Sequence, residues 1–172
     1  MAKKNYYAQL SSYDEAIRTL RTNLLFSDID NKISKVVVTS SVPDEGKTSI
    51  SFELAKSLAQ NGNSVVLLES DLRNPSISEP SGLENSIGIT NILMKKVTIE
   101  EALVNDIEED NLFLLFAGPT PPNPAELISS DAMKNLILEL DKKFDYVIID
   151  TPPVGILTDA AIMSTYADGV VL

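Results

Sequence analysis

The 172-residue sequence contains neither cysteine nor histidine. The lack of cysteine excludes disulfide bonds and thiolate metal sites, and the lack of histidine excludes His-based catalytic triads and His metal ligands. Any chemistry must therefore use carboxylates, lysine, tyrosine or hydroxyl groups. No apolar run approaches the roughly 18 residues of a membrane-spanning helix, and the N-terminal MAKKNYYAQL lacks the apolar stretch of a signal peptide. We therefore expect a cytoplasmic protein.

Basic residues are few: 14 Lys and Arg stand against 25 Asp and Glu, which gives a net charge of −11. Because nucleic acids and anionic lipids are bound through Lys and Arg, this balance argues against broad contact with either, and no nucleic-acid partner is expected. The hydrophobic share of 44% is ordinary for a soluble globular protein. The length suffices for one domain with a buried core.

Short apolar runs alternate with helical patterns along the chain. Strands are predicted at Lys35–Thr39, Ser64–Glu69, Leu112–Ala117, Asp145–Asp150 and Gly169–Leu172, and helices at about 12–27, 47–61, 98–104, 130–143 and 156–166. Continuous apolar strands such as SVVLL and YVIID suit a sheet that is buried on both faces. The alternation predicts an α/β fold with a mostly parallel sheet flanked by helices. In such sheets ligands bind at the carboxyl ends of the strands.

The last residues, DGVVL, predict an interior strand at 169–172. A terminal carboxylate there would be buried or would fray the sheet. We therefore expect the natural protein to continue beyond Leu172 and the chain to be a C-terminally shortened piece of it.

The segment SSVPDEGKTS, at 40–49, lies between a predicted strand and a predicted helix, which is the layout of a nucleotide-binding P-loop. Such a loop needs backbone N–H groups that face the phosphates, a lysine that reaches the β- and γ-phosphates, and a hydroxyl for Mg²⁺. Gly46 permits a close approach of the backbone, Lys47 supplies the charge and Thr48 the hydroxyl. Ser49 is placed to reach an α-phosphate.

The glycine that usually stands five residues before Gly46 is replaced by Ser41. Serine is small, and Pro43 can stiffen the loop, so the replacement weakens the pattern without removing it. The alternative interpretation is an ordinary strand–turn–helix that happens to carry Gly-Lys-Thr. On the nucleotide interpretation the candidate binding residues are Ser41, Pro43, Asp44, Glu45, Gly46, Lys47, Thr48 and Ser49.

Acidic residues at two further strand ends strengthen the nucleotide interpretation. VVLLESDLRNP ends its apolar run on Glu69 and Asp71, and YVIIDTPP ends its run on Asp150. Each acid alone could cap a helix or stand in a turn. An acid at the end of a buried strand beside a P-loop can, however, hold Mg²⁺ through water. The three strand ends together predict one nucleotide site.

Phosphoryl transfer requires positioning, neutralisation of charge and a group that accepts the proton of the attacking hydroxyl. Glu69 and Asp71 can divide this work if the chain turns between them, so that one binds a metal-bound water while the other faces the acceptor. The spacing leaves open which acid takes which role.

These segments resemble those of the bacterial tyrosine kinases of capsule and exopolysaccharide synthesis, P-loop proteins related to the MinD/ParA-type ATPases. SSVPDEGKTS is similar to their Walker A motif, VLLESDLRNP to Walker A′ and YVIIDTPP to Walker B. AGPTPPNPAELI, at 117–128, resembles a Pro-rich stretch of the family, and EAIRTLRTN, at 15–23, matches its E-x-x-R-x-x-R pattern. TDAAIMSTYADGVVL resembles the segment after Walker B. The likeness covers nearly the whole chain.

The resemblance implies a P-loop fold and ATP-dependent autophosphorylation on tyrosine. It implies that Lys47 and Thr48 bind ATP or ADP with Mg²⁺, and that Asp71 and Asp150 serve the metal. The resemblance implies that the first acid of Walker A′ helps to activate the tyrosine hydroxyl, and here this acid is Glu69, one methylene longer than aspartate. The implied catalytic set is Lys47, Glu69, Asp71 and Asp150. Because catalysis is sensitive to displacements of about 1 Å, a reduced activity would fit the longer side chain.

Glu15, Arg18 and Arg21 lie three residues apart and therefore share a helix face. One interpretation is a solvated, self-paired helix surface. The resemblance implies instead a subunit contact in a ring-shaped homo-oligomer, where a neighbour's tail enters the active site. The chain is accordingly predicted to be one P-loop kinase domain, 1–172. Its parts are an N-terminal helix and oligomerisation segment at 1–30 and a nucleotide-binding core at 31–172.

The tyrosine cluster of the family lies in a C-terminal tail, and the sequence ends before such a tail. The tyrosines present are Tyr6, Tyr7, Tyr13, Tyr146 and Tyr166. Tyr146 falls in a predicted core strand, and Tyr6 and Tyr7 in a terminus expected to be disordered. The substrate is therefore expected to be a tyrosine-containing protein. The resemblance also implies a separate membrane-embedded activator, of the polysaccharide co-polymerase type, that recruits the domain to the inner face of the membrane.

Two other functions remain open. A MinD/ParA-type positioning ATPase would transfer the phosphate to water, but its usual extra lysine early in the loop is here Val42. The acidic balance also argues against DNA binding of the ParA kind. A nucleotide-binding assembly protein that has lost kinase activity is consistent with Ser41, Glu69 and the missing tail.

Overall fold

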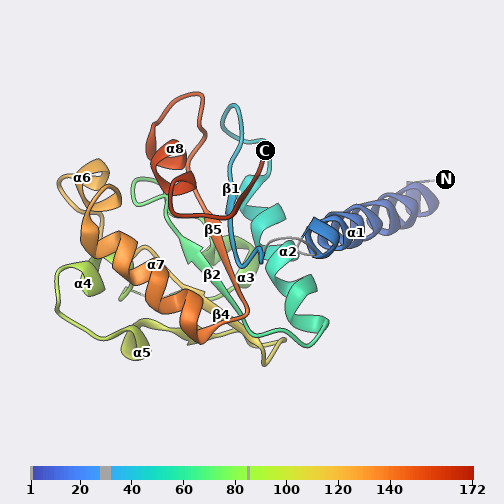
Figure 1. Ribbon diagram of the computed structural model, residues 1–172. Coiled ribbons are helices and arrows are strands. Elements are labelled where there is room, and N and C mark those ends of the chain that lie inside the picture. The colour runs from blue at the N-terminus through green and yellow to red at the C-terminus, as the bar shows by residue number, and fades with distance from the viewer. Residues whose placement is uncertain (1, 28–31, 85) are drawn as a thin grey trace.

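The computed structural model describes residues 2–27, 32–84 and 86–172, with side chains from residue 12 onward. A six-stranded sheet runs through the molecule in the order β3-β4-β2-β5-β1-β6 (Figure 1). The strands are β1 (Lys35–Val38), β2 (Val65–Glu69), β3 (Val104–Asn105), β4 (Leu112–Leu115), β5 (Tyr146–Asp150) and β6 (Gly169–Val171). β3 pairs antiparallel with β4, and the other pairs are parallel. The predicted α/β fold with a mostly parallel sheet is confirmed.

Helices cover both faces of the sheet. Apolar side chains of α2 (Lys47–Gln60) pack on one face and those of α7 (Asp131–Lys143) on the other. Within β2, Val66 faces the α7 layer and Val65 the α2 layer. All residues of β2 are buried, because the strand is covered from both sides. Shorter helices lie in the connections: α3 (Ser78–Ser81), α4 (Ile89–Leu93), α5 (Ile99–Ala102), α6 (Pro124–Ile128) and α8 (Asp159–Ser164).

Several predicted boundaries differ from the structure. The sequence patterns missed β3, α3, α4 and α6, which are too short to show a hydrophobic period. The helix predicted at 98–104 ends at Ala102, because Leu103 has extended backbone and leads directly into β3. The helix predicted at 156–166 spans only Asp159–Ser164.

Among the described residues β6 lies at an edge of the sheet, whereas the sequence pattern predicts an interior strand at 169–172. It pairs with β1 on one side. Its apolar side chains are only partly covered, and Val170 is 53% exposed.

The N-terminal helix α1 (Ala2–Ser27) is longer than the helix predicted at 12–27. It begins at Ala2, where the sequence suggested a disordered terminus, and extends away from the sheet (Figure 1). Its C-terminal half contacts α2, and Ile17 is buried there. Tyr6 and Tyr7 belong to this helix, but their side chains lie outside the described part.

The parallel register places the predicted motifs at one rim. Val38 at the end of β1 pairs with Asp150 at the end of β5, and Asp150 pairs with Glu69 at the end of β2. The loop before α2 and the two acidic strand ends therefore open on the same side of the sheet.

Candidate nucleotide site

The loop between β1 and α2 turns at two residues with left-handed backbone, Asp44 (φ 62°) and Gly46 (φ 83°). Glycine adopts this conformation without strain, and aspartate is among the side chains that tolerate it. Ser41 does not have a positive φ. Serine can therefore stand where the usual pattern has glycine.

Glu45 fastens the first half of the loop. Its carboxylate accepts hydrogen bonds from the backbone N–H groups of Ser41 (2.8 Å) and Val42 (3.1 Å). The N–H groups of residues 44–46, in contrast, have no acceptor within the described part of the chain. With the unpaired N–H groups of the first turn of α2, they form a set of donors that suits an anion.

Lys47, the first residue of α2, reaches the ends of the neighbouring strands. Its Nζ lies 3.8 Å from Asp71 Oδ2 and 3.9 Å from Asp150 Oδ2, and it donates to Thr48 Oγ1 at 3.2 Å. Asp71 is buried, and its Oδ1 accepts a hydrogen bond from the backbone N–H of Asn74 (3.0 Å). The structure thus gathers a lysine, a hydroxyl and two carboxylates from three separate motifs.

Asp150 is fully buried at the end of β5. Its carboxylate accepts hydrogen bonds from the hydroxyls of Thr48 (2.8 Å) and Ser51 (3.0 Å). Burial raises the pKa of Asp150 to about 6, although Lys47 and these two hydroxyls act in the opposite direction. The carboxylate of Glu69 adds to the rise. A buried carboxylate of this kind is stabilised when a further cation binds beside it.

The donor set fits Mg²⁺, because Thr48 Oγ1 and the carboxylates of Asp71 and Asp150 are all oxygen ligands. Among the described residues, no three or more acidic side chains are grouped closely enough to hold a metal by themselves. Mg²⁺ beside a nucleotide is typically held by one or two carboxylates, with waters and phosphate oxygens in the other positions. The site therefore suits Mg²⁺ bound together with a nucleotide.

Glu69 lies at the same rim, but its carboxylate is bound to backbone. One oxygen accepts from the N–H groups of Ser76 (2.5 Å) and Ile77 (2.6 Å), and the other from that of Ala117 (3.0 Å). Glu69 is 2% exposed. It therefore joins the loop after β2 to the loop after β4.

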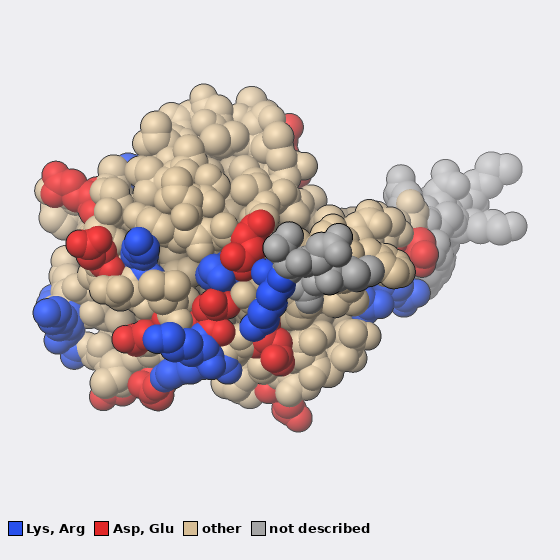
Figure 2. Space-filling model, viewed as in Figure 1, with Lys and Arg blue, Asp and Glu red and all other residues tan. Residues whose placement is uncertain are grey.

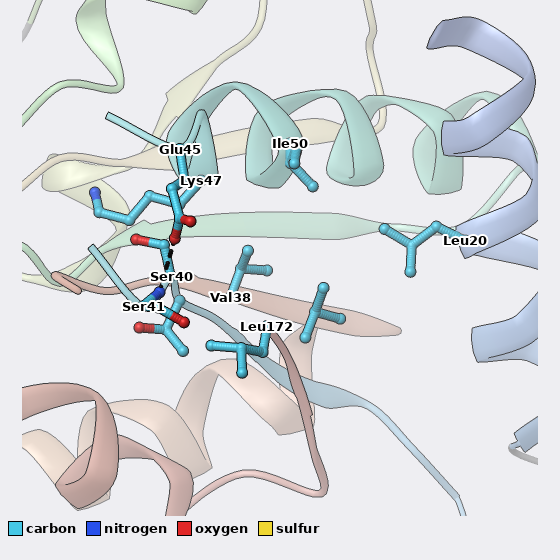
Figure 3. Close-up of a pocket in the computed structure, with 10 residues that line it drawn as sticks. Leu20, Val38, Ser40, Ser41, Glu45, Lys47, Ile50 and Leu172 are labelled. Atoms are coloured by element: carbon cyan, nitrogen blue, oxygen red, sulfur yellow. Dashed lines mark hydrogen bonds between the residues drawn. The ribbon is translucent and has the colours of Figure 1, made fainter. Parts of the chain in front are cut away.

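Two hollows border the phosphate loop. A groove of about 350 Å³ opens beside Lys47 and Asp71 and reaches the loop after β5. A cavity of about 500 Å³ lies between the loop, α1 and the end of β6. In Figure 3, Ser41, Glu45 and Lys47 lie at one end of this cavity and Leu20 of α1 at the other.

Comparison with known proteins identifies the family. A family model described as an AAA domain matches residues 34–172. The tyrosine-protein kinase YwqD of Bacillus subtilis (strain 168) is 44% identical over 158 residues, which are 92% of this chain and 66% of that protein. The tyrosine-protein kinase CpsD of Streptococcus agalactiae is 36% identical over 165 residues, which are 95% of this chain and 71% of that protein. The chain belongs to the bacterial tyrosine kinase family.

Solved structures agree with this assignment. The chimerical protein CapA2B2 matches this bacterial tyrosine kinase chain with a TM-score of 0.86 and 36% identity over 91% of this chain and 68% of that one. The septum site-determining protein MinD of Pyrococcus horikoshii, complexed with Mg-ADP, matches with a TM-score of 0.66 and 21% identity over 80% of this chain and 56% of that one. The MinD match shows a shared P-loop fold alone. The chain spans about two thirds of the length of YwqD.

The sequence analysis missed three polar residues at or near the candidate site. Ser51 bonds Asp150, and Ser76 Oγ lies 3.0 Å from Thr48 Oγ1. Asp159, 2% exposed at the start of α8, forms an ion pair with Arg73. Arg73 follows the Walker A′ acids and Asp159 follows Walker B, so the pair links the two loops. The sequence signal for Asp159 was its position in TDAAIM, three residues before an apolar residue. An aspartate in this position is, however, equally typical of the start of a helix.

The three predicted interface residues have different environments on α1. Glu15 and Arg18 are exposed and form a loose pair, with Arg18 Nη1 3.8 Å from Glu15 Oε2. Arg21 instead donates to the backbone oxygen (3.1 Å) and hydroxyl (3.2 Å) of Ser57 on α2. Arg21 thus holds α1 against the kinase core, while Glu15 and Arg18 stay at the surface.

Charged side chains are unevenly distributed on the surface. In Figure 2 they gather over the lower part of the molecule, while the upper part, over α8 and the loop that precedes it, shows almost none on this face. In the part of the chain that the structure describes, no helix combines the length and apolar character needed to cross a membrane.

Proposed function

We propose that this bacterial tyrosine kinase domain transfers the γ-phosphate of ATP to tyrosine, autophosphorylates in its natural context, and so regulates capsule or exopolysaccharide synthesis and export. The observation that carries the proposal is the position of Lys47, within 4 Å of both Asp71 and Asp150 at the mouth of a P-loop. The names of YwqD and CpsD support tyrosine as the acceptor.

Each group takes one part of the phosphoryl transfer. The free N–H groups of residues 44–46 and the ammonium of Lys47 hold the β- and γ-phosphates. Thr48 and Asp150 would hold Mg²⁺, and the bound ion would neutralise phosphate charge. The oxygen of the acceptor tyrosine then forms a bond with the γ-phosphorus. The bond from that phosphorus to the β-phosphate oxygen breaks, and ADP leaves with the electron pair.

The proton of the tyrosine hydroxyl needs an acceptor, and we assign it to Asp71. Asp71 Oδ2 carries no backbone hydrogen bond, whereas both oxygens of Glu69 are occupied by backbone N–H groups. The resemblance alone assigns this step to Glu69. The contacts of Glu69 support a positioning role for it instead.

The test is incubation of the purified chain with labelled ATP, Mg²⁺ and a peptide that carries one tyrosine. We expect phosphotyrosine from the wild type and none from Lys47→Met. Lys134→Met, at an exposed position on α7, is the matched control and should keep full activity. Free phosphate without phosphotyrosine would instead indicate a positioning ATPase. Neither product, in a protein that binds ADP, would indicate an assembly protein.

We further propose that the kinase forms a homo-oligomeric ring through Glu15 and Arg18 of α1, and that a membrane-embedded activator recruits it to the inner face of the cell membrane. The exposure of Glu15 and Arg18 on a helix that extends from the core supports the ring contact. Arg18→Ala should reduce oligomer size in solution scattering, and Thr19→Ala, on an adjacent exposed position, should not. An unchanged size for Arg18→Ala would remove the ring proposal. Recruitment is tested by locating a tagged chain in cells with and without the co-expressed activator.

A further inference from the structure

The residues that line the groove beside Lys47 fall into two chemical groups. Lys47 and Asp71 are charged and lie close together. The second group, called here the apolar wall, comes from the loop after β5: Pro152, Pro153, Ile156 and Leu157. A reaction with water would need no apolar surface here, so the apolar wall calls for an explanation.

The apolar wall is held in a fixed position against the phosphate loop. The hydroxyl of Thr39 donates to the backbone oxygen of Pro152 (2.9 Å), and the backbone N–H of Val154 donates to the backbone oxygen of Ser40 (2.9 Å). Gly155 packs so closely that a Cβ there would lie 2.2 Å from the backbone oxygen of Ser41. The wall and the phosphate loop therefore form one rigid unit, which can present a surface to a substrate.

Ile156 is the exposed part of this wall. It is 61% exposed, although it lies next to buried Pro152 and Pro153. Ile156 belongs to the loop that precedes α8, and the face over α8 and this loop shows almost no charge in Figure 2. An apolar side chain that lines a groove and remains uncovered beside a reaction centre is suited to an apolar part of the substrate.

We propose that this wall is the subsite for the phenol ring of the acceptor tyrosine, an inference that rests on the proposed kinase function. A ring packed against the exposed side chain of Ile156 buries apolar area there, and its hydroxyl is then directed toward Asp71 and Lys47 in the same groove. The hydroxyl of a serine lies one carbon from its backbone, so serine cannot contact this wall and reach Asp71 in the same way. The wall thus selects tyrosine over serine and water.

The experiment measures transfer to three short peptides that differ at one position, Tyr, Ser or Phe. The wild type should phosphorylate the Tyr peptide and not the Ser peptide, and the Phe peptide should inhibit competitively. Ile156→Ser should raise KM for the Tyr peptide about tenfold, with a smaller change in kcat, and should weaken inhibition by the Phe peptide to a similar degree. ADP affinity, measured on the same preparation, reports whether the phosphate site is formed.

Two controls locate the effect. Ile107→Ser, at a 75% exposed isoleucine far from the groove, and Val154→Ser, on the same loop but outside the groove, should leave KM for the Tyr peptide unchanged. An unchanged KM in Ile156→Ser, or an equal rise in Val154→Ser, would overturn the ring subsite while leaving the kinase function intact. A wild type that phosphorylates no Tyr peptide at all would refute the proposed function itself, and the subsite with it.

Discussion

Replacing Glu69 by glutamine is expected to destabilise the kinase fold strongly, because the carboxylate accepts hydrogen bonds from three backbone N–H groups. Glutamine keeps one acceptor oxygen, but it turns an NH₂ group toward at least one N–H donor. The variant therefore loses one or more charge-assisted bonds, worth about 1.5–3 kcal/mol each, and leaves a buried donor unpaired. We expect the free energy of unfolding to fall by about 2–4 kcal/mol.

A loss of this size should lower the melting temperature by roughly 5–15 °C for a chain of this length. Thermal and urea unfolding of the nucleotide-free protein measure it. Glu79→Gln, at an exposed glutamate on α3, is the control and should unfold like the wild type. If Glu69 acted only as a catalytic base, Glu69→Gln would abolish phosphorylation and leave the melting temperature within about 1 °C of the wild type. That result would refute the positioning role.

Three other predictions follow from single contacts. Gly155→Ala should lower the affinity for Mg-ADP at least about tenfold, because the added Cβ would displace the backbone of Ser41 in the phosphate loop. Calorimetry measures this affinity, and an unchanged value would contradict the prediction. In metal-free protein, the raised pKa of Asp150, about 6, means that the native state binds a proton more tightly than the unfolded chain. The contribution of Asp150 to the free energy of unfolding should therefore fall as the pH rises from about 4 to 6, and Asp150→Asn should be more stable than the wild type at pH 8 by about 1–3 kcal/mol. Equal stability at pH 8 would count against this. The pKa of Asp145 is lowered by the backbone N–H and hydroxyl of Ser64, so its stabilisation exists at neutral pH and is lost as the pH falls through the lowered pKa. Asp145→Asn should thus be less stable than the wild type at pH 7, and urea titrations should show the difference shrink toward pH 3.

The rim of the sheet could be predicted from the sequence because parallel strands place their ends together. The runs that end on Asp150 and Glu69 are apolar up to the acid, so their burial and register follow from pattern alone. Periodicity likewise predicted α2 and α7. The phosphate loop could be predicted although Ser41 replaces the usual glycine. The structure shows why serine is tolerated: Ser41 does not have a positive φ.

What the sequence could not supply was the partner of each polar group. Glu69 and Asp71 have similar positions in the motif. Only the fold shows that the carboxylate of Glu69 accepts a hydrogen bond from the backbone N–H of Ala117, which lies in a distant loop. The pair of Arg73 and Asp159 joins residues 86 positions apart, and no local pattern signals it.

The bonds from Ser41 and Val42 to the carboxylate of Glu45 have a consequence for the speed of nucleotide capture. Since a side chain of the protein itself already satisfies these donors, the loop is folded to shape before any ligand arrives. The loop is therefore preorganised, and little of the binding free energy of a nucleotide is lost in ordering the chain. Capture of ATP should accordingly be limited by diffusion into the rim and not by a slow closing of the loop.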